Sequence, residues 1–430
     1  MKKYTLLLAL LFILQIITAQ EVTDFTTNAN TIKILNLESN TLSNINKIEA
    51  KETKVVQIDK SISQEDFDKI CAKLKWIKKL SIDYDNPSIN NILSISTLTD
   101  LESLKIRNLL SSKKTPVDLL PLTKLILLKE IDFYGTIVSN TDALQTLINL
   151  EKVILYKSNV SSINFLAFTP LVKEIDLNGS EHTFTNYEPI KTLKKLRSID
   201  IQSNTQATDQ NLTLFNEFLE LREINISQCS QITSLQFLNN ANKLQEFTAI
   251  DCKKIVNFTA LDDMIMLKRV NLNGTPIFDL SFVSNKTELK DLQISNTQIS
   301  NLLPIVACIN LDKLDISNTS ISDISHLSKL TKLRKLNISF TLVTSLSAIS
   351  NLIDLTDLDA SNTKITDLTP LALCKKLANI NISNSSVTDI KNLYTLDKIM
   401  SLQVPTAIPQ AQIDAIKIRF PRMRIDIDKK

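Results

Sequence analysis

The side chains of this 430-residue sequence that could ligate a metal or act as nucleophiles are few: 2 histidines and 5 cysteines. A zinc site needs three or four Cys, His or carboxylate ligands that converge on one point. His182 and His326 are far apart in the chain, and neither has cysteines at a short ligand spacing. We expect a solvated loop at His182 and a surface helical position at His326. The sequence therefore predicts neither a metal site nor another cofactor.

Glycine content bears on nucleotide chemistry. The chain has 3 glycines, Gly135, Gly179 and Gly274, and they are too dispersed to form a glycine-rich phosphate-binding loop. Together with the scattered histidines, this argues against catalysis. We therefore expect that the protein is not an enzyme.

The sequence contains a repeated pattern of leucines, and the structure that these repeats form would position any candidate binding residue. The pattern LxxLxI recurs with a constant step of 22 residues, and its copies begin at Leu267, Leu289, Leu311, Leu333, Leu355 and Leu377. Looser copies extend upstream to Val55 at steps of 22 to 27 residues. Such strict spacing is typical of repeats that stack into one continuous core.

Each repeat predicts one strand and one short helical segment. The alternation of apolar and polar residues in LDKLDIS (residues 311–317) indicates a strand that buries one face. A single strand cannot bury that face, but stacked strands can, as a parallel sheet along one side of a solenoid. Further along each repeat, Ser or Thr before Pro, as at Thr369, favours a short helical or 3-10 segment. The expected fold class is α/β, with a curved parallel sheet on the concave side and the short helical segments on the convex side.

The 22-residue motif LxxLxIxxTxIxDL resembles the leucine-rich repeat, particularly the bacterial type found in internalins. The resemblance implies a solenoid that is capped at both ends and serves as a scaffold for partners. Where internalins favour Asn, this chain has hydroxyl or thiol side chains, which we expect to bond backbone groups in the turn. They are Thr136, Cys229, Cys252, Thr275, Thr297, Thr319, Thr341, Thr363 and Ser385.

The two ends of the chain are expected to differ from the repeats. Residues 1–19 have the two lysines and the apolar run of a secretory signal peptide, and the run is short for a bilayer span, which favours a cleaved signal over the alternative of an uncleaved anchor. We assign residues 20–54 to an N-terminal segment or cap, 55–398 to the leucine-rich repeats and 399–430 to a C-terminal cap. One helix should begin after Ser63 and another after Pro409.

Charge and hydropathy bear on location and partners. The 49 basic and 46 acidic residues are mixed along the chain, so no basic face is available for nucleic acid. No stretch after the signal peptide approaches the roughly 20 apolar residues of a membrane helix. We expect an exported protein, which is periplasmic, at the cell surface or secreted, with no membrane span after signal cleavage.

The cysteines do not have the spacing of a small disulfide-rich domain. Cys308 and Cys374 occupy a repeat position that leucine fills elsewhere, so we expect both in the core. Cys229 and Cys252 lie one repeat apart, close enough for a disulfide. The sequence favours buried thiols at this pair and leaves the disulfide as the alternative.

Binding is the remaining function, and the sheet offers the widest ordered surface. Tyr134 and Tyr156 occupy the same column on consecutive coils, with Ile154, Lys152 and Glu130 alongside. Exposed aromatic residues among mixed charges are typical of interface anchors, although two tyrosines could also simply stack on each other.

The columns after Leu267 carry small polar residues instead, which favours a solvated face and leaves a glycan or divalent-cation surface as alternatives. We predict a non-catalytic scaffold that recognises a protein or cell-surface partner through its concave sheet face. The alternative is a structural or glycan-binding protein of the cell envelope.

Overall fold

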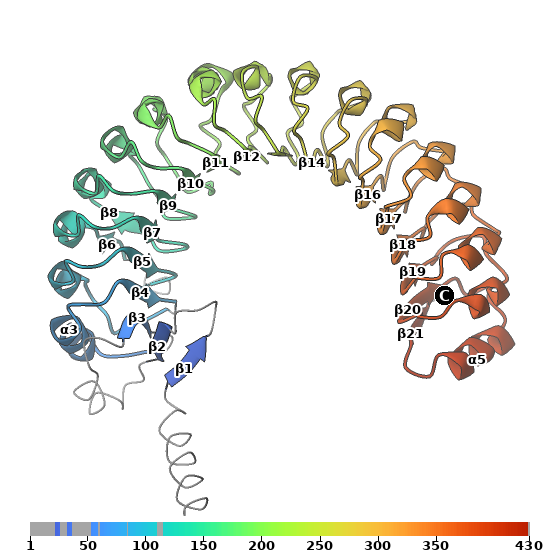
Figure 1. Cartoon of the computed structure of the whole chain (residues 1–430), viewed down its shortest axis with the longest axis horizontal. Helices are drawn as coiled ribbons and strands as arrows, with labels where there is room; N and C mark the ends of the chain where they lie inside the picture. The colour runs from blue at the N-terminus through green and yellow to red at the C-terminus, as the bar shows by residue number, and fades with distance from the viewer. Residues whose placement is uncertain are drawn as a thin grey trace, which may run out of the picture. The chain divides into compact units, whose positions relative to one another are not determined.

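The computed structural model describes residues 22–25, 32–36, 53–58, 61–83, 85–109 and 115–428. The expected signal peptide, residues 1–19, lies outside these ranges. The chain divides into two compact units, Met1–Gln206 (unit 1) and Ala207–Lys430 (unit 2), and each is described by itself. In both units, a short strand and a short helical segment alternate along the chain (Figure 1).

The sheet of unit 1 pairs each strand in parallel with the strand of the next coil, except that β1 and β2 are antiparallel. Its strands are β1 (Val22–Phe25), β2 (Ile32–Asn36), β3 (Thr53–Ile58), β4 (Lys79–Ile82), β5 (Ser103–Ile106), β7 (Glu130–Asp132), β9 (Lys152–Ile154), β10 (Glu174–Asp176) and β11 (Ser198–Asp200). Two further strands, β6 (Val117–Asp118) and β8 (Val138–Ser139), pair with each other.

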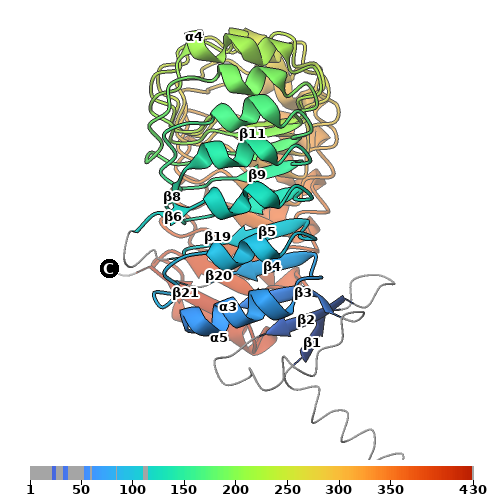
Figure 2. The same cartoon turned by 90° about the vertical axis from the view of Figure 1, so that its left-hand side faces the viewer.

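The helical segments of unit 1 stack coil upon coil in the same order as the strands (Figure 2). Ser63 caps the first of them, because its side chain accepts a hydrogen bond from the Asp66 N–H at 3.0 Å, and this prediction is confirmed. The segments are α3 (Gln64–Lys73), η2 (Leu93–Thr97), η3 (Leu120–Lys124), η4 (Thr141–Thr146), η5 (Asn164–Phe168) and η6 (Glu188–Thr192).

Unit 2 repeats the same plan, and all its strands pair in parallel. They are β12 (Glu223–Asn225), β13 (Glu246–Thr248), β14 (Arg269–Asn271), β15 (Asp291–Gln293), β16 (Lys313–Asp315), β17 (Lys335–Asn337), β18 (Asp357–Asp359), β19 (Asn379–Asn381), β20 (Ser401–Val404) and β21 (Arg424–Ile427).

The helical segments of unit 2 are short 3-10 turns, apart from α4 and α5. As predicted, α5 begins after Pro409 and buries Ile413 and Ile416. The segments are α4 (Asp209–Leu212), η7 (Thr213–Glu217), η8 (Gln236–Leu238), η9 (Thr259–Leu261), η10 (Ser281–Val283), η11 (Leu303–Ala307), η12 (Ser325–Lys329), η13 (Ser347–Asn351), η14 (Thr369–Leu373), η15 (Lys391–Thr395) and α5 (Gln410–Arg419).

The register of the strands follows the 22-residue step. Leu314, Leu336 and Leu358 lie opposite one another on neighbouring strands, and all three are buried. The residues on either side of each leucine are partly or fully exposed. The predicted alternation is therefore confirmed, and the outward-facing residues form columns that run across the sheet.

A ladder of hydroxyl groups satisfies the turns after β14 to β19 of unit 2. Thr297, Thr319, Thr341 and Thr363 each donate a hydrogen bond, 2.6 Å long, to the carbonyl oxygen three residues earlier. The thiol of Cys252 instead donates to a carbonyl of the preceding coil, that of Ile226, at 3.1 Å. These bonds satisfy buried carbonyl groups, as predicted.

All five cysteines are buried thiols. Cys308 and Cys374 lie in the core, as predicted, and donate to the carbonyls of Val283 and Ile349. At Cys229 and Cys252 the structure agrees with the interpretation as thiols rather than with the disulfide. Burial raises the pKa of Cys252 to about 11, so this thiol is un-ionised and unreactive at neutral pH.

The prediction of a solvated loop at His182 is wrong. The side chain is only 2% exposed, and its Nδ1 accepts a hydrogen bond from the Val160 N–H at 3.1 Å. Phe184 and Tyr187 are buried in the same loop, which explains the burial. In the sequence, the alternation of His182 and Phe184 with polar residues was the signal that could have indicated this burial. His326 lies in η12 and is half-buried, so its predicted helical position is confirmed.

Acid is expected to destabilise the protein partly through His182. Burial lowers the pKa of His182 below its ordinary value, so the unfolded chain binds the proton more readily. The contribution to stability is present above pH ~6.5 and is lost as the pH falls through the folded pKa. His182→Asn, which keeps an acceptor for the Val160 N–H, should lose less stability between pH 7.5 and pH 5 in urea titrations. Identical pH dependence in both proteins would contradict this account.

Candidate binding surfaces

The predicted tyrosine pair of unit 1 is brought together by strand register. Asp132 of β7 lies opposite Ile154 of β9, so the residues two positions further on are also neighbours. The rings of Tyr134 and Tyr156 stack with centroids 4.3 Å apart and planes inclined by 12°. Tyr134 is 41% exposed and Tyr156 is half-buried. Mutual stacking is therefore observed, while a binding role for the pair stays a prediction.

The other predicted residues lie beside this pair, but the two charged ones have internal partners. Lys152 pairs with Glu174 (Nζ to Oε2, 2.6 Å), and the hydrogen bond that Lys152 donates to Glu174 raises the pKa of Lys152. Glu130 accepts a hydrogen bond from Ser103 and pairs with Lys105 at 3.1 Å. These charges therefore hold neighbouring coils together at the rim of the surface. Ile154 is half-buried and lies between Asp132 of β7 and Asp176 of β10.

Asp176 on β10 belongs to the same surface, although the sequence analysis did not single it out. It lies opposite Ile154 and is half-buried. Burial raises the pKa of Asp176 to about 6, and repulsion from Asp200 and Asp132 adds to the effect. Its place in the outward column was readable from the repeat. The absence of a counter-ion could not be predicted from the sequence, because it depends on which neighbouring carboxylates the lysines pair with.

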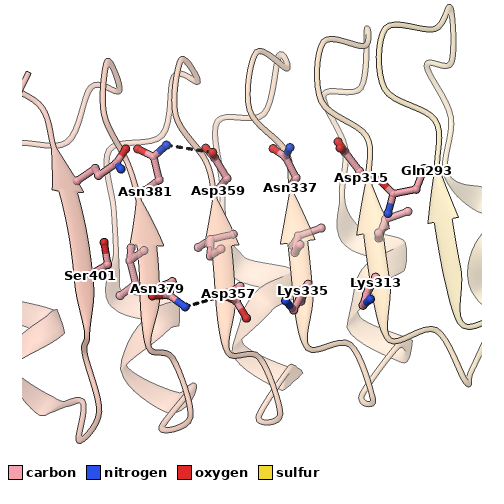
Figure 3. Close-up of a pocket in the computed structure, with 15 residues that line it drawn as sticks. Gln293, Lys313, Asp315, Lys335, Asn337, Asp357, Asp359, Asn379, Asn381 and Ser401 are labelled. Carbon is pink, nitrogen blue, oxygen red and sulfur yellow. Dashed lines mark hydrogen bonds between the residues drawn. The ribbon is translucent and has the colours of Figure 1, made fainter. Parts of the chain in front are cut away.

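Unit 2 has a shallow groove of about 360 Å³ on its sheet face, across β15 to β20 (Figure 3). One wall alternates carboxylates and carboxamides from strand to strand, at Asp315, Asn337, Asp359 and Asn381. Asn381 donates a hydrogen bond to Asp359 at 3.0 Å, so part of this column is internally satisfied. The opposite wall includes Lys313, Lys335, Asp357, Asn379 and Ser401. One of the polar columns expected from the sequence thus lines the groove, together with lysines and with leucine and isoleucine side chains, and the lining includes no aromatic residue.

Phe340 is a second residue that the sequence analysis did not single out. It has φ of 54° and is 59% exposed, whereas the two repeats before it and the two after it place an asparagine at this left-handed position. Asparagine tolerates a positive φ far better than a bulky side chain does. The next exposed apolar side chain, Leu342, lies close by in sequence. The break in the asparagine series, at NISF in place of DISN, was a readable signal.

Phe340→Asn is expected to stabilise unit 2 by about 1 kcal/mol, because it relieves the cost of a left-handed backbone at a non-glycine residue. Urea denaturation followed by circular dichroism would measure the change. The matched reversal is Asn362→Phe, at a position with φ of 53°, which should destabilise by a similar amount. If both variants had wild-type stability, backbone strain at Phe340 would be ruled out.

Within the described ranges, no helix has the length and apolar character needed to cross a bilayer. In that same part of the chain, no group of three or more His, Cys, Asp and Glu side chains is placed to hold a metal ion.

Comparison with known proteins gives a family match and several structural neighbours. Residues 309–351 match the model described as leucine-rich repeats (2 copies), and no curated protein matches the chain. The crystal structure of an internalin (InlF) from Listeria monocytogenes is 26% identical, with a TM-score of 0.61, and the match covers 74% of this chain and 88% of that one.

Two more distant neighbours are similar in fold. A leucine-rich-repeat protein of Leptospira interrogans is 17% identical with a TM-score of 0.62, covering 91% of this chain and 99% of that one. A plant peptide hormone receptor, RGFR1, solved in complex with RGF2, is 14% identical with a TM-score of 0.52, covering 88% and 70%. The repeat match and the structural likeness confirm the resemblance read from the sequence: the chain has the leucine-rich-repeat fold of internalin-like bacterial proteins.

Proposed function

We propose that this chain is an exported, non-catalytic scaffold that recognises a protein or cell-surface partner through the sheet face of unit 1. The leucine-rich-repeat fold suggests a protein-binding scaffold, and the side chains on the sheet face of unit 1 support this face as the contact surface. One observation carries the proposal: the exposed stack of Tyr134 on Tyr156, held on a regular sheet beside Ile154. Rigid aromatic side chains next to apolar surface are the usual anchors of protein interfaces.

Two further features support the proposal. The RGFR1 neighbour was solved in complex with RGF2, so a solenoid of this fold can hold a ligand. The signal-like segment at residues 1–19 supports export, with the repeats at residues 55–398 and a cap at 399–430 forming the mature scaffold.

Photo-cross-linking from one side chain would test the proposal. We would replace Ile154 with p-benzoylphenylalanine in the full chain, cross-link in the producing cells and then fractionate them. The matched control places the same group at Ile148, which is 57% exposed but lies outside the strands. We expect a protein adduct from position 154 and none from position 148, in the exported fraction. Adducts from position 148 alone would refute the sheet face, and a chain retained in the cytoplasm would refute export.

The groove of unit 2 favours a second candidate, a structural or glycan-binding protein of the cell envelope. Its alternating carboxamides and carboxylates could hydrogen-bond sugar hydroxyl groups. If this candidate holds, soluble cell-wall polysaccharide or a chelator should release the protein from cell envelopes. Asp315→Ala with Asn337→Ala should weaken that retention, while substitutions at Tyr134 and Tyr156 should leave it unchanged.

A further inference from the structure

The half-buried carboxylate of Asp176 lies on β10, one strand beyond the coil that carries Tyr156. It is opposite Ile154 on one side and Asp200 on the other. One oxygen, Oδ1, accepts a hydrogen bond from the Asn178 N–H at 2.9 Å. Among the described residues, Oδ2 accepts none and no cation pairs with the side chain. Asp176 is therefore a carboxylate that lacks a counter-ion.

Three neighbouring carboxylates on the same face, those of Glu130, Asp132 and Glu174, form ion pairs. Asp132 accepts two hydrogen bonds from Arg107, at 2.5 and 2.9 Å, and Glu130 pairs with Lys105. Lys152 is the cation nearest to Asp176 along β9, but it is bound to Glu174 at 2.6 Å. These three carboxylates thus have cations of the protein itself, whereas Asp176 is open to a cation from a partner.

The full electrostatic surroundings of Asp176 are mixed but carry no spare cation close to it. Its pKa responds to Asp200, Asp132 and Lys152, and burial is the largest influence. The charged or titratable groups around it are Asp132 and Tyr134 near β7, Lys152, Tyr156 and Lys157 near β9, Glu174 on β10 and Asp200 on β11. Lys157 lies over the Tyr156 ring, 5.3 Å from its centroid.

The apolar neighbours favour arginine over other cations. Arginine combines a planar guanidinium, which binds carboxylates and stacks on aromatic rings, with an apolar stem. Ile154 and the tyrosine pair could contact the stem while Asp176 binds the guanidinium. A lysine ammonium is more strongly hydrated and stacks less well, so it would lose more on leaving water.

We propose that the partner of unit 1 is a protein that inserts an arginine side chain beside the tyrosine pair, with its guanidinium on Asp176. The proposal rests on the proposed function and adds the chemistry of the contacting residue. Asp176 is then the specificity-determining residue of the surface, and the tyrosines are its apolar anchors. The two neighbouring carboxylates, Asp176 and Asp200, would disfavour an acidic ligand.

Defined peptides would test this on the full-length protein. The probe is a fluorescent peptide with one arginine between two leucines in a Gly/Ser background, and the comparison peptides carry lysine or citrulline instead. Citrulline keeps the shape of the side chain and removes the charge. Fluorescence anisotropy should show binding of the arginine peptide, weakened about tenfold or more with citrulline.

Two variants and a pH change locate the contact. Asp176→Asn should weaken binding of the arginine peptide about tenfold, whereas Asp359→Asn, in the corresponding column of unit 2, should leave it unchanged. Binding should also fall from pH 7.5 to pH 5 in the wild type, as Asp176 becomes neutral, and should not fall in the Asp176→Asn variant.

The outcomes separate this inference from the proposed function. Equal binding of the arginine and citrulline peptides, or an unchanged affinity in Asp176→Asn, would overturn the arginine contact. In that case, if the double variant Tyr134→Ala and Tyr156→Ala weakened capture of the cross-linked partner, the proposed function would stand without the arginine contact. If neither the tyrosine variant nor Asp176→Asn affected the peptide or the partner, both would be overturned.

Discussion

One alanine inserted between Leu314 and Asp315 is expected to destabilise unit 2 by at least about 4 kcal/mol. The side chains of a strand alternate between its faces, so the insertion turns Asp315 toward the core and Ile316 toward solvent. Ile316 is fully buried in the native protein. The chain would therefore lose a buried apolar side chain and gain a buried carboxylate without a partner. Thermal and urea unfolding followed by circular dichroism would measure the loss.

The control for this prediction is an alanine inserted between Thr406 and Ala407, which are both exposed in the turn before α5. It should cost much less, because no buried side chain changes face. The loop around Tyr187 is unsuitable as a control site, because Tyr187 is only 1% exposed. Equal losses from the two insertions would refute the assigned register.

Replacing both tyrosines with alanine is expected to weaken capture of the partner by at least about 2 kcal/mol, near thirtyfold in affinity. The double substitution Tyr134→Ala and Tyr156→Ala removes both rings of the stack, and with them the largest exposed apolar side chains beside Ile154. Binding would be measured with the protein identified by cross-linking from position 154. Circular dichroism must show that the variant is folded.

Two controls make the tyrosine result specific. Tyr134→Phe with Tyr156→Phe keeps both rings and should retain most of the affinity. Ser317→Ala with Ser339→Ala, on the sheet face of unit 2, should barely change capture, because small solvated side chains contribute little. A folded tyrosine variant with normal capture, combined with loss of capture on changes around His326, would exclude the sheet face as the binding surface.

The sequence by itself determined the solenoid. The 22-residue step and the alternation within LDKLDIS require neighbouring strands in parallel register, and Leu314 and Leu336 are paired as the pattern predicts. The stacking of Tyr134 on Tyr156 was predictable for the same reason, since one column position on consecutive coils brings two side chains about 5 Å apart. A repeat is a local, one-dimensional signal, and these features depend on nothing else.

Only the tertiary structure decided which polar groups were buried and which charges were paired. His182 is buried because an irregular loop folds Phe184 and Tyr187 inward, and a loop that departs from the repeat carries no register from which to predict this. Asp176 lacks a counter-ion because Lys152 pairs with Glu174 instead. Long charged side chains can reach several neighbours on adjacent coils. Which ion pair forms therefore depends on side-chain geometry in three dimensions, and the spacing of residues along the chain does not contain this information.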